Sequence, residues 1–323
     1  MKGNDYRLIP EGGENALASL EKKLQLLRDL VTAVVKGFKN GLFLYGSGGV
    51  GKSFTVLNHL QHLESCYQLY NSRMTGKGLF LTLKHAPDAI HVLEDMERLA
   101  KDADAQGVLR TALWAQPGHE RVVTWTTATD GTQRFVFRGG LILISNRPLA
   151  DLPELRALAT RIEVHRLDVS DAELEALMRH LAGRGYRQHD KLVIGPEECL
   201  EVTEHLLREC RAAGCPLDLR LQQKSLQTYL QWESDWSNCH WRDLVTASVR
   251  EATHHFRHET NTLSWEGRKM HKRNILREIL REVPDDVEEQ VKRYRKQAGG
   301  SRADFYRRKR EVQMGDFDEE DAA

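Results

Sequence analysis

The stretch Gly46-Ser47-Gly48-Gly49-Val50-Gly51-Lys52-Ser53 decides the fold of this chain of 323 residues. It matches the pattern G-x-x-x-x-G-K-[ST], which requires a strand before it and a helix after it. The preceding run Leu42–Tyr45 is short and apolar, as is typical of a buried parallel strand. The following residues 53–63 have the pattern of a helix. The sequence therefore predicts a phosphate-binding loop at the carboxyl end of a buried strand.

This loop has the features that bind the phosphates of a nucleotide. Its glycines let the backbone curl so that successive N–H groups point at phosphate oxygens. The following helix presents its positive N-terminal end to the same anion. We expect the Lys52 ammonium to reach the β- and γ-phosphates and the Ser53 hydroxyl to ligate Mg²⁺. The predicted cofactors are ATP and Mg²⁺, and the predicted nucleotide-binding residues of this segment are Gly46, Ser47, Gly48, Gly49, Val50, Gly51, Lys52, Ser53 and Phe54.

Further apolar runs predict more strands of the same sheet. Residues 89–93 and 141–144 are buried-strand candidates, and residues 133–138 alternate like one arm of a hairpin. Apolar residues recur at helical spacing over residues 14–38. Strands that alternate with helices predict an α/β fold, a P-loop parallel sheet sandwiched by helices.

Polar side chains follow two of the predicted strands. Glu94 and Asp95 end one strand, and Asn146 follows another. Hydrolysis of a nucleotide needs an acid that holds Mg²⁺ through water and often a second that polarises the attacking water. We expect Glu94 and Asp95 to fill these roles, with Glu94 beside Ser53 at the metal. The alternative is that both acids begin a solvated helix, since residues 96–99 continue with helical spacing.

Helical signals replace strand signals after about residue 167. Ser170 can cap a helix, and residues 196–213, 219–232 and 241–256 predict three more. We predict a nucleotide-binding core over 1–166, an all-helical lid over 167–262, a basic helical segment over 263–311 and an acidic, disordered tail over 312–323.

The basic segment predicts a helix-turn-helix. One helix starts after Pro284, residues 298–300 break it, and Ser301 can cap a second. The alternative is an amphipathic tail that packs on the lid or binds a partner protein. The residues predicted to contact DNA are those of the second helix, Arg302, Arg307, Arg308, Lys309 and Arg310.

Over roughly residues 14–260, the order of these parts resembles the AAA+ family of ATPases. The resemblance implies that Asn146 senses the γ-phosphate and that Arg220, which follows Asp218 at a helix start, contacts the nucleotide from within the same subunit. It implies that Arg161 acts as an arginine finger on the neighbouring subunit, with Arg147 and Arg156 as competitors. Copies of the chain would then form a ring or spiral, such as a hexamer.

One departure from the family concerns the pair of acids. The family usually ends this strand with Asp-Glu, whereas the order here is Glu94-Asp95. The shorter second carboxylate would stand about one methylene farther from the water. Slow hydrolysis, or a switch driven mainly by ATP binding, is therefore an alternative to a fast motor.

Composition limits the class of protein. The chain is 40% hydrophobic and 29% charged, and no run of 18 apolar residues exists. The first residues lack the pattern of a signal peptide, so we expect a cytoplasmic protein without a membrane partner. The five cysteines form no metal-binding spacing, and we expect reduced thiols. The net charge of zero hides a basic segment, with 15 Lys/Arg against 7 Asp/Glu over 268–310, before an acidic end.

These features predict an ATPase that couples nucleotide binding and hydrolysis to action on DNA. The overall arrangement of its parts resembles that of ATPases of phage, plasmids and mobile elements that act in DNA replication or transposition. Three alternatives stay open: a DNA-bound scaffold that is gated by ATP with negligible turnover, a protein remodeller whose basic tail grips polypeptide, and a P-loop kinase.

Overall fold

A computed structural model describes residues 11–71, 74–94, 99–116, 118–127, 131–149, 158–188, 191–262, 265–284 and 286–320. The chain divides into two compact units, Met1–Val249 and Arg250–Ala323. The second unit thus begins inside a helix and earlier than the boundary near residue 263 that the sequence suggested.

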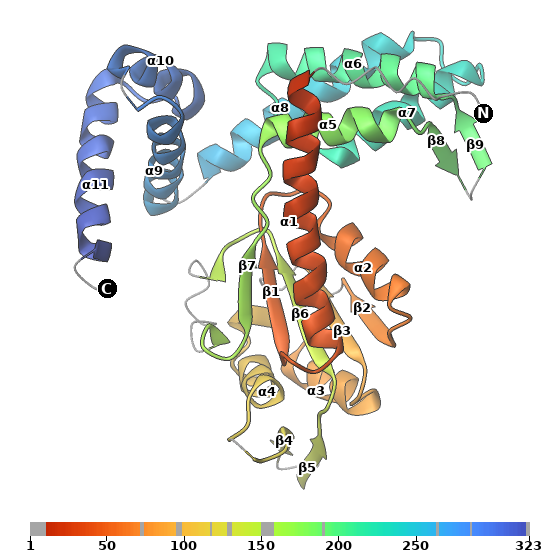
Figure 1. Cartoon of the computed structure of the whole chain (residues 1–323), viewed down its shortest axis with the longest axis vertical. Helices are drawn as coiled ribbons and strands as arrows, with labels where there is room; N and C mark the ends of the chain where they lie inside the picture. The colour runs from red at the N-terminus through yellow and green to blue at the C-terminus, as the bar shows by residue number, and fades with distance from the viewer. Residues whose placement is uncertain are drawn as a thin grey trace. The chain divides into compact units, whose positions relative to one another are not determined.

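The first unit is built on a parallel sheet of five strands in the order β2-β3-β6-β1-β7 (Figure 1). Every residue of β6 is buried, which explains why this strand reads as a continuous apolar run. The predicted α/β fold class is therefore confirmed. The strands are β1 (Gly41–Tyr45), β2 (Tyr67–Tyr70), β3 (Ile90–Glu94), β6 (Gly140–Ser145) and β7 (Glu163–Arg166).

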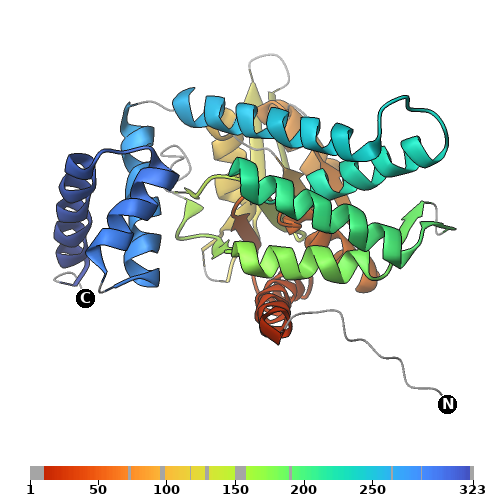
Figure 2. The same cartoon turned by 90° about the horizontal axis from the view of Figure 1, so that it is seen from above.

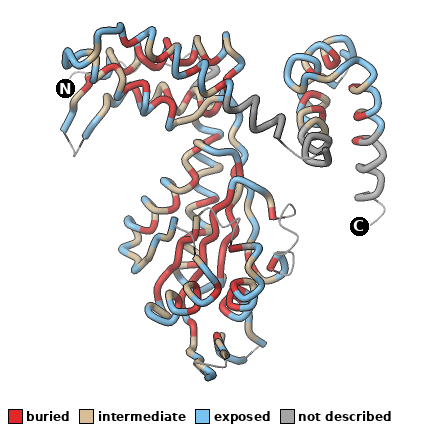
Figure 3. The backbone as a smooth tube through the Cα atoms, turned by 180° about the vertical axis from the view of Figure 1, so that it is seen from behind, coloured by how far each residue is buried: buried red, intermediate tan, exposed pale blue. Residues whose placement is uncertain are grey.

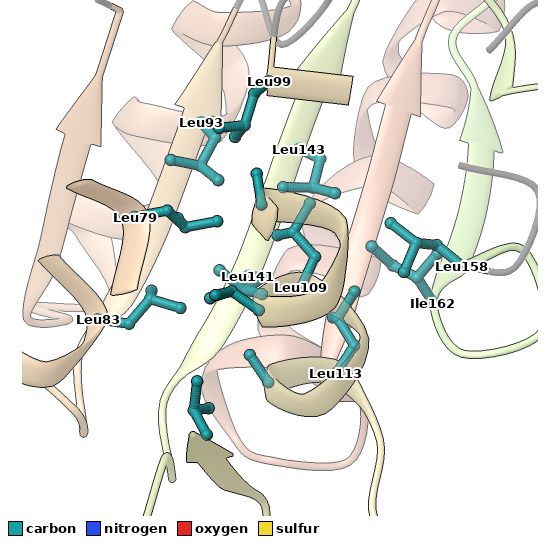
Figure 4. Close-up of a cluster of buried hydrophobic side chains, with 14 of the residues drawn as sticks. Leu79, Leu83, Leu93, Leu99, Leu109, Leu113, Leu141, Leu143, Leu158 and Ile162 are labelled. Atoms are coloured by element: carbon teal, nitrogen blue, oxygen red, sulfur yellow. The ribbon is translucent and has the colours of Figure 1, made fainter. Parts of the chain in front are cut away.

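Helices cover both faces of this sheet. On one face α1 (Glu11–Val35) runs along the strands (Figure 1), and a Cβ at Gly140 would lie 2.4 Å from the Val34 side chain. Next to α1 lies α2 (Lys52–His62). On the other face, α3 (Gly76–His85) and α4 (Ala103–Leu113) pack their leucines against β3 and β6 (Figure 4). Because side chains alternate along a strand, each strand supplies both layers of the core.

Two short hairpins lie outside the main sheet. The first pairs β4 (Val122–Thr127) with β5 (Gly131–Val136), close to the predicted hairpin arm. The second pairs β8 (Tyr186–Gln188) with β9 (Lys191–Ile194) inside the lid, which the sequence had indicated to be all-helical. Strands of three and four residues are too short to show a period of two, so their pattern could not be recognised from the sequence.

The lid consists mainly of helices (Figure 2). Here α5 (Asp171–Ala182) packs on α6 (Pro196–Ala213), and α6 packs on α7 (Leu219–Glu233). The predicted cap of α5 is present as a capping box, because Ser170 accepts from the Glu173 backbone and Glu173 accepts from the Ser170 backbone. The next helix is α8 (Trp241–Thr262), and it contains the division between the two units.

The second unit contains α9 (Trp265–Glu282), α10 (Val287–Ala298) and α11 (Arg302–Glu320). Its helix break lies where the sequence predicts it, with Gly299 at φ +62° and the Ser301 hydroxyl accepting from the Asp304 backbone. A small core of its own holds the helices together (Figure 3), and its buried residues are Leu276, Ile279, Val291, Tyr294, Phe305 and Val312.

The acidic end differs from the prediction. We expected residues 312–323 to be disordered, but α11 continues as far as Glu320. Acidic composition argues against burial in a core, not against helical backbone, and this segment contains no proline. Within the described residues, no helix has the length and apolar character needed to cross a bilayer.

His91 makes the stability of the first unit depend on pH. Its side chain is fully buried in β3, where Nε2 lies 2.8 Å from the Ala86 carbonyl oxygen and Nδ1 has no partner in the described part of the chain. Burial lowers the pKa of His91 below its ordinary value of 6.5, although the Ala86 contact opposes this shift. The unfolded chain therefore binds the proton more readily than the folded chain.

We predict that the free energy of unfolding falls as the pH drops below about 6.5 and is level above that value. His91→Gln, which can still donate to Ala86 but does not titrate, should show a shallower fall in urea unfolding at pH 5 to 8. An equal slope in the two proteins would contradict this assignment. The remaining slope would come from the other histidines whose pKa is lowered by burial, which are His59, His165 and His180.

Candidate functional site

The carboxyl ends of three neighbouring strands form one edge of the sheet. Tyr45 of β1 pairs with Ser145 of β6, and Glu94 of β3 pairs with Ile144 of the same strand. The loop that begins at Gly46 therefore starts beside Asn146, and Glu94 ends the next strand along. The strand register therefore brings the residues that were predicted to act on one nucleotide to the same edge of the sheet.

The backbone of the loop depends on its glycines. Gly49 and Gly51 have φ values of +71° and +88°, in the left-handed region that side chains disfavour. At Gly46 the constraint is space, because a Cβ there would lie 2.3 Å from the Leu167 carbonyl oxygen. These three positions explain why the loop sequence is glycine-rich.

The first turn of α2 has no capping side chain for its backbone donors. Its N-cap residue, Gly51, offers no side-chain cap, and no acid lies in the first turn. The first N–H groups of a helix need acceptors and carry part of the positive end of the helix dipole. An anion at the loop would supply those acceptors, so this local structure fits a phosphate group.

Lys52 connects the loop to the neighbouring strand. The residue is only 6% exposed. Its ammonium donates to the carbonyl oxygens of Gly46 at 2.9 Å and Ser47 at 2.6 Å, and to Oδ1 of Asn146 at 3.0 Å. The structure thus brings together two residues that are 94 positions apart and that the sequence assigned to the same phosphate.

Glu94 presents an unsatisfied acceptor at this edge. Its Oε1 atom is buried and has no hydrogen-bond partner among the described residues. A buried carboxylate oxygen without a donor is costly, and a water molecule or a hydrated cation would relieve that cost. The oxygens of Glu94 and Ser53 are therefore of the kind that binds Mg²⁺ held with a nucleotide. Asp95, the second predicted acid, lies outside the described residues.

Two other residues of the predicted set differ in exposure. Ser53 is half-buried at the start of α2, as a residue facing a bound ion would be. Phe54, the next residue, is 74% exposed and leaves a large apolar ring on the surface beside the loop.

Arg161 lies at the other end of the sheet from the loop. It precedes β7, whose first residue, Glu163, pairs with Leu42, whereas the loop follows Tyr45, which pairs with Arg166. This register separates the two ends by about 10 Å along the strands. The guanidinium is therefore poorly placed for the loop of its own subunit. Of the competing arginines, Arg147 is exposed next to Asn146, and Arg156 lies outside the described residues.

The lid reaches the loop through the start of α7. The backbone N–H of Leu219 donates to the Gly49 carbonyl oxygen at 3.1 Å. Arg220, the next residue, is exposed, and its own N–H donates to Oδ1 of Asp218 at 2.6 Å. Arg220 is thus one residue from a direct contact with the loop. The sequence marked this helix start but gave no sign that Asp218 and Leu219 touch Gly49.

A second contact joins the core to the lid. The Lys23 ammonium of α1 donates to Oε2 of Glu173 at 2.8 Å and to the Asp168 carbonyl oxygen at 2.7 Å, and Ser19 donates to Glu173 at 2.8 Å. Burial alone would raise the pKa of Glu173, but these hydrogen bonds and that from the Ser170 backbone outweigh burial and lower it. The carboxylate therefore stays charged and holds α1 against α5.

The predicted DNA-binding residues fall into two groups in the second unit. Arg302 and Arg310 are exposed, and the Arg307 side chain is 64% exposed while pairing with Asp304. Arg308, in contrast, is only 6% exposed and faces Asp304 from inside the helical unit. Arg308 is therefore a structural residue and is poorly placed to contact DNA. Its helical position, one turn after Asp304, sets it on the core side of α11.

Lys309 and Asp304 tie the helices of this unit together. The Lys309 ammonium donates to Oε1 of Gln290 on α10 at 3.0 Å. Asp304 accepts from Lys272 of α9 at 2.9 Å and from the Tyr294 hydroxyl of α10 at 3.1 Å. Lys309 is therefore only partly available to a ligand.

The sequence did not identify a basic groove that runs along α10. Its volume is about 820 Å³. Four cations line it, Lys292, Arg295, Lys296 and Arg302, together with Val291 and the acids Asp286, Glu288 and Glu289. Helical spacing on α10 could have indicated the first three, since they follow one another at one turn or less.

Comparisons with known proteins give distant similarities. No family model matches the chain. A curated relative, described as an uncharacterized 36.7 kDa protein in the nrdC-mobD intergenic region of enterobacteria phage T4, is 23% identical over 175 residues, which cover 47% of this chain and 52% of the relative. The chain thus spans about half the length of the curated relative that it matches.

Similar solved structures include two DNA-related proteins. The RuvB Holliday junction branch migration motor of Thermotoga maritima is 16% identical, with 81% of this chain and 75% of that chain covered and a TM-score of 0.43. The Orc1 protein of Aeropyrum pernix in complex with DNA is 13% identical, with 85% and 76% covered and a TM-score of 0.43. Structural similarity at these TM-scores does not indicate a function. The function of this chain is therefore inferred from its own residues.

Asp304 allows a test of which contacts hold the helices of the second unit together. Burial alone would raise the pKa of Asp304, but hydrogen bonds from Lys272, Arg307 and Tyr294 outweigh burial and lower it to about 2. The stabilisation is therefore complete above pH 3.8 and is lost as the pH falls toward 2. We predict that Asp304→Asn destabilises the unit by about 1.5–3 kcal/mol at pH 7.

Hydrogen exchange of α10 and α11 in the full chain measures this loss directly. Glu288→Gln, which neutralises an exposed acid in the same unit, is the matched control and should leave exchange unchanged. Equal exchange in the two variants would show that Asp304 does not hold the helices together.

Proposed function

We propose that this protein is an ATPase of the AAA+ type that couples the binding and hydrolysis of ATP to action on DNA. The observation that carries the proposal is the constellation at one edge of the sheet. There a positive-φ glycine loop leads into an uncapped helix, Lys52 contacts Asn146, and a buried oxygen of Glu94 lacks a donor.

Binding would use groups that are already in place. The N–H groups of the loop and of the first turn of α2 would donate hydrogen bonds to the phosphate oxygens, and Lys52 would exchange its carbonyl partners for phosphate oxygens. Ser53 and Glu94 would hold Mg²⁺, which neutralises charge on the phosphates when bound. Arg220, placed next to the loop by Leu219, would contact the nucleotide from the lid.

Hydrolysis would need one residue to orient water and another to sense the γ-phosphate. With Glu94 at the metal, Asp95, the next residue in the sequence, would supply the carboxylate that accepts a proton from an attacking water. Asn146 can release Lys52 from its Oδ1 and donate from its side-chain N–H to a phosphate oxygen. The exchange of partners at Lys52 and Asn146 would report the presence of the γ-phosphate to β6.

Arg161 would act on the site of a neighbouring copy. Its position at the amino end of β7 supports this role, because the register keeps it away from the loop of its own subunit. A complete active site would then need two copies, arranged in a ring or spiral. The number of copies, a hexamer for example, is part of the proposal.

DNA would contact the exposed cations of the second unit. Arg302, Arg307 and Arg310 on α11 and the basic groove along α10 form a surface suited to phosphate contacts. Similarity to a phage protein supports an association with phage or other mobile elements, and the role that we propose there is in replication or transposition. The order Glu94-Asp95 favours one second candidate, a DNA-bound scaffold that is gated by ATP and has negligible turnover.

Mixing two inactive variants tests the shared site. We predict that Lys52→Ala and Arg161→Ala each lower ATP turnover by about a hundredfold or more. An equal mixture should regain part of the wild-type rate, because some interfaces pair an intact loop with an intact Arg161.

Three outcomes would change this view. Turnover at the wild-type rate in Arg161→Ala would remove Arg161 from the site, and Arg147→Ala would then test its competitor. Failure of the mixture to regain activity would contradict a shared site. Absence of turnover in the wild type, with ATP bound, would favour the scaffold.

The salt dependence of DNA binding tests the second unit. We predict that Arg302→Ala, Arg307→Ala and Arg310→Ala each weaken binding to duplex DNA and reduce the slope of log K against log salt by about 0.9. Lys224→Ala, which removes an exposed cation of the lid, should leave the slope unchanged. If all four variants showed the same slope, the partner of this surface would be a polypeptide and not DNA.

A further inference from the structure

We infer that Asp218 makes the nucleotide site select for the magnesium complex of ATP over metal-free ATP. This inference rests on the proposed function and adds a residue that sets its specificity. The carboxylate lies on the phosphate-binding loop, where it repels anionic ligands in proportion to their charge. Metal-free ATP carries about two more negative charges than its magnesium complex, so it is the more strongly disfavoured ligand.

Asp218 is in direct contact with the loop. A Cβ built on Gly49 would lie 2.2 Å from both Cγ and Oδ1 of Asp218 and 2.5 Å from Oδ2. The whole carboxylate group therefore covers Gly49, and only glycine leaves room for it. The adjacent hydrogen bond, from the Leu219 N–H to the Gly49 carbonyl oxygen, fixes the two segments at 3.1 Å.

The carboxylate is held in this position by its own helix. Asp218 is the N-cap of α7, and its Oδ1 accepts from the Arg220 N–H at 2.6 Å. Its carbonyl oxygen accepts from the N–H groups of Leu221 and Gln222. Rotation of the side chain away from the loop would uncap α7, which costs about 1 kcal/mol in typical helices. The charge thus stays beside the phosphates unless the lid itself moves.

Asp218 forms no ion pair within the part of the chain that the structure describes. The Lys52 ammonium donates to Gly46, Ser47 and Asn146. A negative charge next to a loop that otherwise presents backbone donors lowers the affinity for every phosphate ligand. The magnesium ion reduces the charge of the ligand, and with it the repulsion.

Asp218→Asn removes this charge with little change of shape. Asparagine is as good an N-cap as aspartate, so α7 keeps its start. We expect metal-free ATP, measured in EDTA by equilibrium titration, to bind about fivefold or more tightly to the variant than to the wild type. With excess Mg²⁺ and a non-hydrolysable ATP analogue, the gain should be about twofold or less, so selectivity for the magnesium complex falls.

Two further variants control for structure. Asp218→Ser also keeps a capping residue without charge and should reproduce the change. Asp102→Asn makes the same replacement at the N-cap of α4, whose Asp102 side chain accepts from the N–H groups of Asp104 and Ala105, and should leave both affinities unchanged.

Each other outcome overturns the inference. Unchanged affinities in Asp218→Asn would show that the carboxylate does not act on the ligand. An equal gain for both ligands would point to release of the lid rather than to charge, and weaker binding would make Asp218 a favourable contact. These results leave the proposed function intact, whereas failure of the wild type to bind either form of ATP would remove both.

Discussion

The rest of the first unit depends on one constraint, the supply of backbone N–H donors at the junction of β1 and α2. Gly49 and Gly51 have positive φ values, and because the N-cap residue Gly51 has no side chain, the first turn of α2 starts without a side-chain cap. Such donors need an acceptor, and a helix N-terminus favours a negative one. The parallel sheet then determines what surrounds that acceptor, because the carboxyl ends of β6 and β7 adjoin the loop and β3 ends next to β6.

The same junction explains how a nucleotide could influence the lid. Gly46 touches Leu167, where the chain leaves the sheet for the lid, and Gly49 touches Asp218, where α7 begins. Two points of the loop are thus in contact with two points of the lid, and Glu173 holds a third contact with α1. These contacts give a change in the loop backbone a direct route to the lid.

Local signals in the sequence predicted the local features well. The loop, the buried runs of β1, β3 and β6, the cap at Ser170 and the break before Ser301 were all foreseen, because each depends on a few adjacent residues. Features that depend on distant parts of the chain were not. The contact of Asp218 with Gly49 joins segments far apart in sequence, and the burial of Arg308 depends on which face of α11 meets α9. The roles of Glu94, Arg161 and Arg220 stay predictions, as the placement of these residues is known and their chemistry is not.

The most direct test of the central claim is the affinity of the purified protein for ATP in the presence of Mg²⁺, measured by calorimetric titration. The account predicts saturable binding of one nucleotide per chain, and Lys52→Ala should weaken that binding by about tenfold or more, because a charge-assisted contact with phosphate is lost. Equal affinity in the two proteins, or no binding by the wild type, would contradict it.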